Sequence, residues 1–414
     1  MKTLCIFEDE AYSQLLPMTY TRPVYDLVCG MTSLREKIKS VFAGYRIVLQ
    51  CRAHLAPVLR REHPDIPVNR IPEGDCLFIN GRILANADLV AQIPLDGKNE
   101  SYFVDDTLAA CQLNWERIRN LDLSVPLNRE VFNVDKKNTI DAIFVQYPWD
   151  LVEKNEKQIE QDFHVLVSDG FIEGTVWEHV SFIERSKVYV GKSAIIRPGV
   201  VLDAERGPIY IGEGVTVFPN AVIEGPAYIG PKTQIKAGAR ITGGTTIGPV
   251  CKIGGEVDRS VILGFSNKQH DGYLGHSYIG NWVNFGAGTT NSDLKNNYHS
   301  VKVFVNGNEV DTGSLFVGLF IGDHSKSGVN MMFNAGTVIG ICCNVFGAHF
   351  PPKFVPSFSW GGYGGFTEYD IEKVIGTARV VMARRDLELT AEEEELLRYV
   401  FHMTAEERRN IYQS

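Results

Sequence analysis

The sequence lacks any long hydrophobic segment. No apolar run of 18 residues occurs in the 414-residue chain, and a membrane-spanning helix needs roughly that length. The first residues, MKTLCIFEDEAYS, contain too short an apolar run and too many carboxylates for a secretory signal. We therefore expect a cytoplasmic protein with no membrane partner.

Excess positive charge and paired cysteines are also missing. Asp and Glu number 50 against 41 Lys and Arg, for a formal net charge of −9, so no basic surface argues for a nucleic-acid partner. The eight cysteines form no C-x-x-C pair, which argues against zinc and suits buried thiols in a reducing compartment. The length of the chain predicts more than one domain.

What the sequence does contain is a six-residue repeat. An aliphatic residue falls at every sixth position from Ile211 to Ile253, and Gly follows many of these positions, as in IGEGVT, IGPKTQ and IGPVCK. This period predicts a parallel β-solenoid, in which each hexad forms one flat side and points its aliphatic residue inward. Gly or Asn takes the tight corners, where φ is positive. Stacked coils then satisfy the backbone hydrogen bonds.

The segments on either side of the repeat differ from it. Residues 1–165 carry short apolar runs separated by polar and helical stretches, which predicts a small α/β domain. Residues 166–350 form the predicted solenoid domain. Within it, residues 301–313 interrupt the hexads and read as a hairpin that turns at Asn306 and Gly307.

Residues 351–414 read as an aromatic and Gly-rich connector followed by a helical tail. Capping-box pairs, which mark helix starts, are Thr367 with Asp370, Thr390 with Glu393, and Thr404 with Glu407. The end of a solenoid exposes unpaired strand edges. We expect the tail to cover such an end or a neighbouring subunit.

One motif in the solenoid points to chemistry. His270 is followed by x-x-Tyr-Leu-Gly and then by a hexad ending in VNFGAGT. This pattern resembles the left-handed β-helix acyltransferases, most closely the acetyltransferase half of the bifunctional N-acetylglucosamine-1-phosphate uridylyltransferase/glucosamine-1-phosphate acetyltransferase family, over roughly residues 185–350. The resemblance implies a left-handed β-helix, acetyl-CoA as co-substrate and a homotrimer. It also implies an acyl acceptor that is an amino-sugar phosphate or a nucleotide-linked amino sugar.

The resemblance further implies roles for single residues. His270 would be the general base that takes a proton from the acceptor amine. The matching substrate contacts are Lys236, Glu256, Arg259, Tyr273 and Asn284, and the matching positions along the acetyl-CoA path are Ala287, Asn291 and Ser292. The loop TTNSDLK is shorter than the family's loop, and the family's second phosphate-binding Lys falls at Asp258 or Arg259. The identities of the acyl acceptor and the acyl donor therefore stay open.

His276 lies six residues after His270, where the family usually has Asp. The γ-type carbonic anhydrases are also hexapeptide solenoids, and they bind zinc through three histidines. Under that alternative, His299, His324 and His349 supply further ligands. However, two residues six apart lie on adjacent sides of the solenoid, and the sequence has no H-x4-H pair. We therefore expect no metal and leave the role of His276 open.

The first domain has a resemblance of its own. Residues 15–38, LLPMTYTRPVYDLVCGMTSLREKI, and 147–162, YPWDLVEKNEKQIEQD, are similar to two motifs of sugar-nucleotide pyrophosphorylases. The resemblance implies a divergent sugar-nucleotidyltransferase-like α/β domain. The family's glycine-rich phosphate loop is replaced by FEDEAYSQ, whose carboxylates should repel a triphosphate. The family's Mg²⁺-binding Asp reads Arg82, which leaves Arg22, Arg82 and Asp150 as candidate nucleotide-binding residues.

Three functions therefore compete. The main hypothesis is acetyl transfer on the solenoid, with the first domain binding a sugar nucleotide or serving as structure. The alternative is a bifunctional enzyme that also carries sugar-1-phosphate nucleotidyltransferase activity of the UDP-N-acetylglucosamine pyrophosphorylase type, with Mg²⁺ only if that domain is active. The third is a non-catalytic scaffold. The acidic FEDE segment argues against the second function, and the intact H-x-x-Y-L-G motif argues against the third.

Overall fold

The computed structural model describes residues 2–93, 100–135, 138–167 and 170–412. These residues form two compact units. The first comprises Met1–Leu27, Thr32–Tyr147 and Thr390–Tyr399, and the second comprises Val28–Met31, Pro148–Leu389 and Val400–Ser414. No helix among the described residues is long and apolar enough to cross a membrane.

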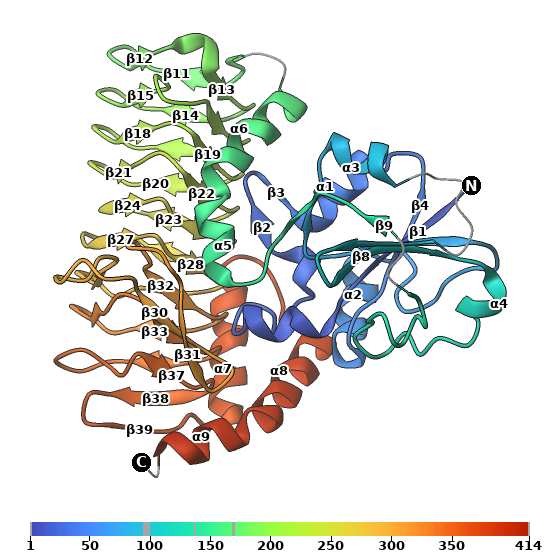
Figure 1. Ribbon diagram of the computed structural model, residues 1–414. Coiled ribbons are helices and arrows are strands. Elements are labelled where there is room, and N and C mark those ends of the chain that lie inside the picture. Colours follow the sequence, from blue (N-terminus) through green and yellow to red (C-terminus); the bar gives the residue numbers. More distant parts are fainter. Residues whose placement is uncertain (1, 94–99, 136–137, 168–169, 413–414) are drawn as a thin grey trace. The chain divides into compact units, whose positions relative to one another are not determined.

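The first unit is built on a mixed sheet (Figure 1). Its elements are β1 (Thr3–Phe7), η1 (Glu10–Leu15), η2 (Val24–Asp26), β3 (Thr32–Ser33), α1 (Leu34–Val41), β4 (Arg46–Leu49), η3 (Ala53–Leu55), α2 (Ala56–Glu62), β5 (Cys76–Asn80), β6 (Ile83–Leu84), α3 (Ala87–Gln92), β7 (Ser101–Val104), β8 (Thr107–Leu113), α4 (Trp115–Ile118), β9 (Asn138–Thr139) and β10 (Ile143–Phe144). The strand order is β4-β1-β5-β8-β7-β9. The predicted α/β fold is confirmed.

The order of the first three strands creates a switch point. Strand β1 pairs parallel with β4 on one side and with β5 on the other. After β1 the chain forms β4 on one side of β1, and it then crosses over to form β5 on the other side. In open α/β sheets of this kind, ligands bind at the carboxyl ends of the strands where the direction reverses. For this unit, that place is the end of β1 next to the end of β5.

The second unit is a parallel β-helix, as the hexads predict, and it is left-handed, as the family resemblance implies. Its strands in chain order begin with β2 (Val28–Cys29), which precedes the coils, and continue with β11 (Thr175–Val176), β12 (Ser181–Ile183), β13 (Val188–Val190), β14 (Ile195–Ile196), β15 (Val201–Asp203), β16 (Ile209–Ile211), β17 (Thr216–Val217), β18 (Val222–Glu224), β19 (Ala227–Ile229), β20 (Gln234–Ile235), β21 (Arg240–Ile241), β22 (Thr245–Ile247), β23 (Lys252–Ile253), β24 (Glu256–Asp258), β25 (Val261–Ile262), β26 (Asn267–Lys268), β27 (Tyr273–Gly275), β28 (Tyr278–Ile279), β29 (Thr290–Asn291), β32 (Leu319–Ile321), β33 (Lys326–Ser327), β34 (Met332–Phe333), β35 (Thr337–Ile339), β36 (Asn344–Val345), β37 (Phe354–Val355), β38 (Ser359–Gly362) and β39 (Gly365–Glu368).

The coils stack three parallel faces (Figure 1). The first face runs β13-β16-β19-β22-β25-β28-β32-β35-β37, the second begins β11-β14-β17-β20-β23-β26, and the third begins β12-β15-β18-β21-β24-β27. Ile211 pairs with Ile229, which pairs with Ile247, so one coil takes three hexads. All three side chains are fully buried in the core. At the corner between the second and third faces, Asn220 and Gly238 have φ of 62° and 69°, as the repeat predicts.

Other elements pack along the coils or project from them. The short η4 (Arg185–Lys187) leads into β13. Two α-helices, α5 (Pro148–Glu153) and α6 (Asn155–Leu166), precede the first coil of the β-helix. Ile159 and Phe163 of α6 pack on a stack of three tyrosines on the first face, Tyr189, Tyr210 and Tyr228. The predicted hairpin is present as β30 (Lys302–Val305) and β31 (Asn308–Asp311), and Gly307 in its turn has φ of 82°.

The last three helices of the described residues are α7 (Ile371–Ala383), α8 (Ala391–Met403) and α9 (Ala405–Tyr412). The capping box of Thr390 and Glu393 is confirmed, because each side chain bonds the other's backbone N–H. The box of Thr367 and Asp370 is wrong. Thr367 belongs to β39, and Asp370 itself caps α7 by accepting from the Lys373 N–H. Thr404 precedes α9, where its hydroxyl donates to the Val400 carbonyl and accepts from Arg408.

Candidate functional site

The predicted base, His270, lies at a corner of the β-helix. It sits in the turn from β26 to β27, between the second and third faces, and its side chain is exposed. Of the predicted substrate contacts, Lys236 occupies the same corner two coils earlier. A Cβ added at Gly254, in the intervening coil, would lie 2.3 Å from the Gln269 carbonyl oxygen and 3.2 Å from Lys236 Cβ. The structure thus brings Lys236 close to the turn that carries His270.

A buried lysine, not predicted from sequence, fixes this turn. Lys268 takes an inward position in register with Ile253 and is 3% exposed. Its Nζ donates to the carbonyl oxygens of Gly254 (2.9 Å), His270 (3.2 Å) and Gly272 (2.6 Å). Burial lowers the pKa of Lys268 to about 8. The signal for it in the sequence is a lysine at the position where the preceding hexads carry an aliphatic residue.

Asn284 lies next to this corner on the second face. It forms a bridge between Asn267 of β26 and Lys326 of β33, and its side-chain oxygen accepts from Asn267 Nδ2 at 3.4 Å. The other predicted substrate contacts lie on the third face. Glu256 pairs in register with Tyr273.

Arg259 lies at the far end of that face, at the corner between the third and first faces. Its guanidinium pairs with Glu156 of α6. It is therefore directed to a neighbouring helix, and the structure does not bring it to the His270 corner.

The predicted acetyl-CoA positions differ in how they are used. Asn291 is 4% exposed, and its amide bonds both the N–H (2.9 Å) and the carbonyl (3.1 Å) of Gly275. It clamps β27 and presents no free amide to a ligand. Ser292 is exposed and donates to the Leu294 carbonyl, and Ala287 is half-buried.

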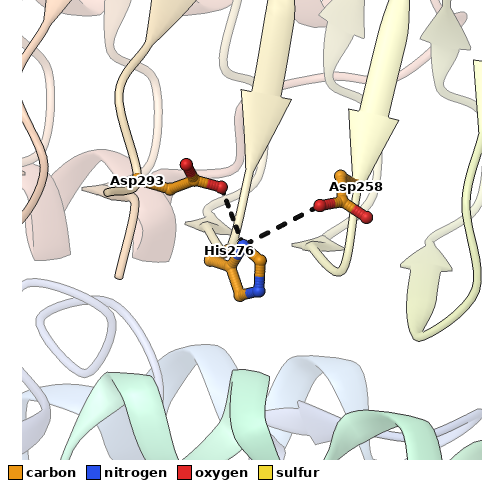
Figure 2. A group of neighbouring side chains, drawn as sticks. All are labelled: Asp258, His276 and Asp293. Atoms are coloured by element: carbon orange, nitrogen blue, oxygen red, sulfur yellow. Dashed lines mark hydrogen bonds and ion pairs between the residues drawn. The ribbon is translucent and has the colours of Figure 1, made fainter. Parts of the chain in front are cut away.

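A second cluster surrounds His276 at the corner between the third and first faces (Figure 2). The His276 Nδ1 atom lies 2.8 Å from Asp293 Oδ2 and 3.9 Å from Asp258 Oδ2. The Tyr273 hydroxyl lies 2.6 Å from Asp293 Oδ2 and 3.2 Å from Asp258 Oδ2. A Cβ at Gly275 would lie only 2.2 Å from the Tyr273 hydroxyl oxygen. The network therefore requires glycine at that position.

This cluster can orient a proton acceptor. Although burial acts to raise it, the pKa of Asp293 lies below its usual range because His276 and Tyr273 donate to the carboxylate. A carboxylate that accepts from Nδ1 leaves Nε2 as the proton acceptor. In Figure 2, Nε2 points away from both carboxylates. The His276 ring also stacks on Phe316, with the centroids 5.2 Å apart.

The same residues bear on the zinc alternative. Among the described residues, the group that brings three potential metal ligands within 4.8 Å of one another is Asp258, His276 and Asp293. It contains one histidine and two carboxylates. His299, His324 and His349 do not join it, so the three-histidine arrangement is not supported.

In the first unit, charged residues fill the switch point. Glu8 and Asp9 directly follow β1. Glu8 is fully buried, and its Oε2 lies 3.1 Å from Arg52 Nε. Asp9 pairs with Arg82 through Oδ1 to Nε (2.8 Å) and Oδ2 to Nη2 (2.5 Å), and its Oδ2 accepts from Asn80 Nδ2 at 2.8 Å.

This pairing weakens the expected repulsion of a triphosphate, because arginines neutralise two of the three carboxylates of FEDEAYSQ. The third, Glu10, is exposed and accepts from Asn128 Nδ2. The pairing also commits Arg82, whose Nη1 donates to the Val145 carbonyl at 3.1 Å. Arg22 Nη1 donates to the Met18 carbonyl at 3.1 Å. Asp150, the third predicted nucleotide-binding residue, lies on α5 in the second unit.

The residues at the switch point do not fit Mg²⁺. The carboxylate there that could coordinate a cation, Asp9, already accepts from Arg82 and Asn80. A divalent cation prefers free carboxylate and carbonyl oxygens, and the Arg82 guanidinium would repel it.

In comparison with known proteins, the N-terminal region and the hexapeptide region match two different family models. Residues 4–170 match the family model for sugar nucleotidyl transferases, and residues 208–243 match the model for bacterial transferase hexapeptide repeats. A bifunctional sugar-1-phosphate nucleotidylyltransferase/acetyltransferase from Sulfurisphaera tokodaii is 39% identical over 97 residues, which is 23% of this chain and 24% of that protein. Bifunctional protein GlmU from Methanocaldococcus jannaschii is 32% identical over 88 residues, 21% of each. The chain thus spans about a quarter or less of these relatives' lengths.

Solved structures resemble the chain more distantly. An Arabidopsis UDP-N-acetylglucosamine acyltransferase is 14% identical, with 52% of this chain and 78% of that chain covered and a TM-score of 0.24. LpxA from Acinetobacter baumannii is 12% identical, with coverage of 59% and 95% and a TM-score of 0.18.

Proposed function

We propose that the protein is a bifunctional enzyme of amino-sugar metabolism. Its β-helix transfers an acetyl group from acetyl-CoA to the amine of an amino-sugar phosphate, and its first unit joins a sugar-1-phosphate to a nucleotide. The observation that carries the proposal is the presence, in one chain, of a sugar nucleotidyl transferase match and a hexapeptide match. The names of both relatives describe bifunctional proteins, and one names these two activities.

In the acetyl transfer, His270 is the general base. It takes a proton from the acceptor amine as the nitrogen attacks the thioester carbonyl carbon. A C–N bond forms, the C–S bond breaks, and the thiolate of CoA leaves and takes up a proton. Lys268 holds the turn that carries His270 through three carbonyl oxygens. Lys236 supplies a positive charge at the same corner for the phosphate of the acceptor.

In the nucleotidyl transfer, a phosphate oxygen of the sugar-1-phosphate attacks the α-phosphorus of a nucleoside triphosphate, and pyrophosphate leaves. Glu8 pairs with Arg52, and Asp9 pairs with Arg82. This supports the activity, because the two ion pairs remove the repulsion that two bare carboxylates would exert on a triphosphate.

A second candidate function is acetyl transfer alone, with the first unit as a binding or structural domain. The observation that favours it is the network of Asp9, Asn80 and Arg82, which fills the place where α/β sheets of this kind bind ligands.

One assay tests both candidates. The purified protein is incubated with acetyl-CoA and glucosamine-1-phosphate, with and without UTP and Mg²⁺, and free thiol and pyrophosphate are followed together. Release of both products supports the bifunctional enzyme, and thiol alone supports the second candidate. Release of neither product contradicts both candidates and favours a scaffold.

The variant His270→Ala tests the assignment of the base. We expect the thiol-release rate to fall by about 10²–10⁴-fold, the usual contribution of a positioned general base, with pyrophosphate release unchanged. His299→Ala, another exposed histidine of the same unit, is the matched control and should retain the wild-type rate. Near-full turnover in His270→Ala would rule out His270 as the base.

A further inference from the structure

A cationic cavity lies on the second face of the β-helix. It has a volume of about 290 Å³, close to the lower end of the range of roughly 300–1,000 Å³ typical of small-molecule sites. Lys252 of β23 and Lys326 of β33 line it from the face, and Arg384 and Arg385 line it from the segment that follows α7. Among the described residues that line the cavity, none is Asp or Glu. Four cationic groups therefore surround one small space.

The charges in this cavity lack a carboxylate partner there. Partial burial and the charges of Arg385, Lys236 and Arg384 lower the pKa of Lys252, and burial lowers the pKa of Lys326. Converging cations disfavour one another. A bound anion would relieve this repulsion.

Arg385 points to the same conclusion. Its Nη2 donates to Asn267 Oδ1 at 3.0 Å, which holds the guanidinium against the face. Its Nε is buried and has no hydrogen-bond partner among the described residues. A buried N–H of a charged group without an acceptor is costly, and an anionic oxygen in the cavity would satisfy it.

Neutral groups complete the lining. The amides of Asn267, Gln269 and Asn284 lie on the face, and the rings of Phe265 and Trp282 stack 4.3 Å apart at the corner between the first and second faces. Amide N–H groups donate to anions as well as to hydroxyls, and the rings offer an apolar wall.

We propose that this cavity is a phosphate-binding site for a small phosphorylated ligand. The cavity lies beside the predicted base, because Gln269 lines it and precedes His270 in the chain. A ligand held here by its phosphate reaches the His270 turn with its other end, a link that rests on the proposed function. Acetyl-CoA and an amino-sugar phosphate both carry the required phosphate.

Binding is measured by calorimetry with three probes: inorganic pyrophosphate, glucosamine-1-phosphate and CoA. The test protein is the double variant Lys252→Met/Arg384→Ala. The matched control is Lys192→Met, which removes an exposed lysine from a distant coil. We expect wild type and the control to bind at least one probe alike, with affinity that falls as salt rises. The double variant should bind that probe at least tenfold more weakly.

The choice of probe distinguishes the two sources of phosphate. A loss confined to CoA assigns the cavity to the acyl donor, and a loss confined to glucosamine-1-phosphate assigns it to the acceptor. Failure of wild type to bind any probe at millimolar concentration overturns the inference, as does equal binding by wild type and the double variant. Arg384→Glu, a change at an exposed position, repeats the test if the double variant does not fold.

The two proposals fail separately in this design. Probe binding that the double variant loses, without any thiol release in the enzyme assay, would leave the phosphate site intact and contradict the proposed acetyl transfer. Thiol release by wild type, with probe binding unchanged in the double variant, would support the acetyl transfer and contradict the phosphate site.

Discussion

At the scale of single residues, Lys268 is the clearest departure from the repeat. In the preceding coils its column holds the aliphatic residues Ile196, Val217, Ile235 and Ile253, and a buried ammonium costs free energy unless it is well bonded. Three backbone carbonyl oxygens accept from it, and two of them belong to the turn of His270. The hexad pattern predicts an inward side chain here, but it cannot predict that the turn supplies three acceptors.

Replacing Lys268 with methionine tests this role. The apolar chain fits the column, but the carbonyl oxygens of Gly254 and His270 lose the Lys268 donor, at a cost of about 1–3 kcal/mol for each group left unsatisfied. The Gly272 carbonyl keeps the Glu256 N–H as a donor. We expect kcat for thiol release to fall at least tenfold with little change in the KM for acetyl-CoA, because the base is displaced and the donor site is not. An unchanged kcat in a folded variant would contradict the role.

The same variant has a signature in pH. The pKa of Lys268 is about 8 in the folded protein against 10.5 ordinarily, so the unfolded chain binds more protons between these values. The free energy of unfolding should therefore rise as pH increases from 8 to 10.5. Urea denaturation across this range should show a smaller rise in Lys268→Met than in wild type, because Lys252 and Lys326 keep their lowered pKa values in both proteins. Parallel curves for the two proteins would contradict it.

Asp293 gives a prediction at the opposite end of the pH scale. Hydrogen bonds from His276 and Tyr273 hold its pKa below the ordinary 3.8, so its contribution to stability is present above that value and is lost as pH falls through the folded-state pKa. Asp293→Asn should cost about 1–3 kcal/mol at neutral pH. The difference from wild type should shrink in acid, as measured by chemical denaturation at pH 7 and pH 3. A difference independent of pH would show that the carboxylate charge is not used.

Arg82 illustrates a role that the sequence could not reveal. The motif comparison identifies it as a substituted metal ligand, but only the fold shows that Asp9 lies beside it. Removing one partner of a buried ion pair costs about 3–5 kcal/mol, because the other charge stays buried and uncompensated.

Arg82→Met should therefore destabilise the protein by that amount, and the double variant Asp9→Asn/Arg82→Met should recover most of it. Thermal unfolding of both variants measures the change in stability, and calorimetry with a UDP-sugar measures binding. Full stability in Arg82→Met together with lost binding would identify Arg82 as a ligand-binding residue instead.

At the scale of elements, the sequence predicts what depends on local spacing. The hexad period predicts the β-helix, and Asn306 with Gly307 predicts the hairpin, because both rest on corner geometry that short segments determine. The start predicted at Thr367 fails because pairing with β38 draws that residue into β39. Local capping signals cannot report such long-range pairing.

The site follows the same division. Asp258, His276 and Asp293 are 18 and 17 residues apart, close to the 18-residue coil, so their stacking follows from the period once that period is known. A family motif does not reveal it, because the family usually has Asp in place of His276. The cationic cavity could not be predicted from the sequence, because Arg384 and Arg385 line it only through the packing of the segment after α7.

At the scale of the whole molecule, assembly is the remaining expectation. His270 is exposed and no carboxylate orients it among the described residues, whereas an efficient general base is usually held in place. A closed ring of identical chains would supply a neighbouring surface at each copy of this corner. We propose that the protein is a homotrimer and that the His270 site is completed by the adjacent chain.

Light scattering at micromolar concentration should therefore give three times the chain mass of 46.2 kDa. On dilution, thiol release per chain should fall as the trimer dissociates, because each site loses the neighbouring chain. Pyrophosphate release, if it resides within one chain, should stay constant over the same dilution and so controls for loss of protein. A monomer with full thiol release would contradict both the trimer and the shared site, and would require His270 to work within a single chain.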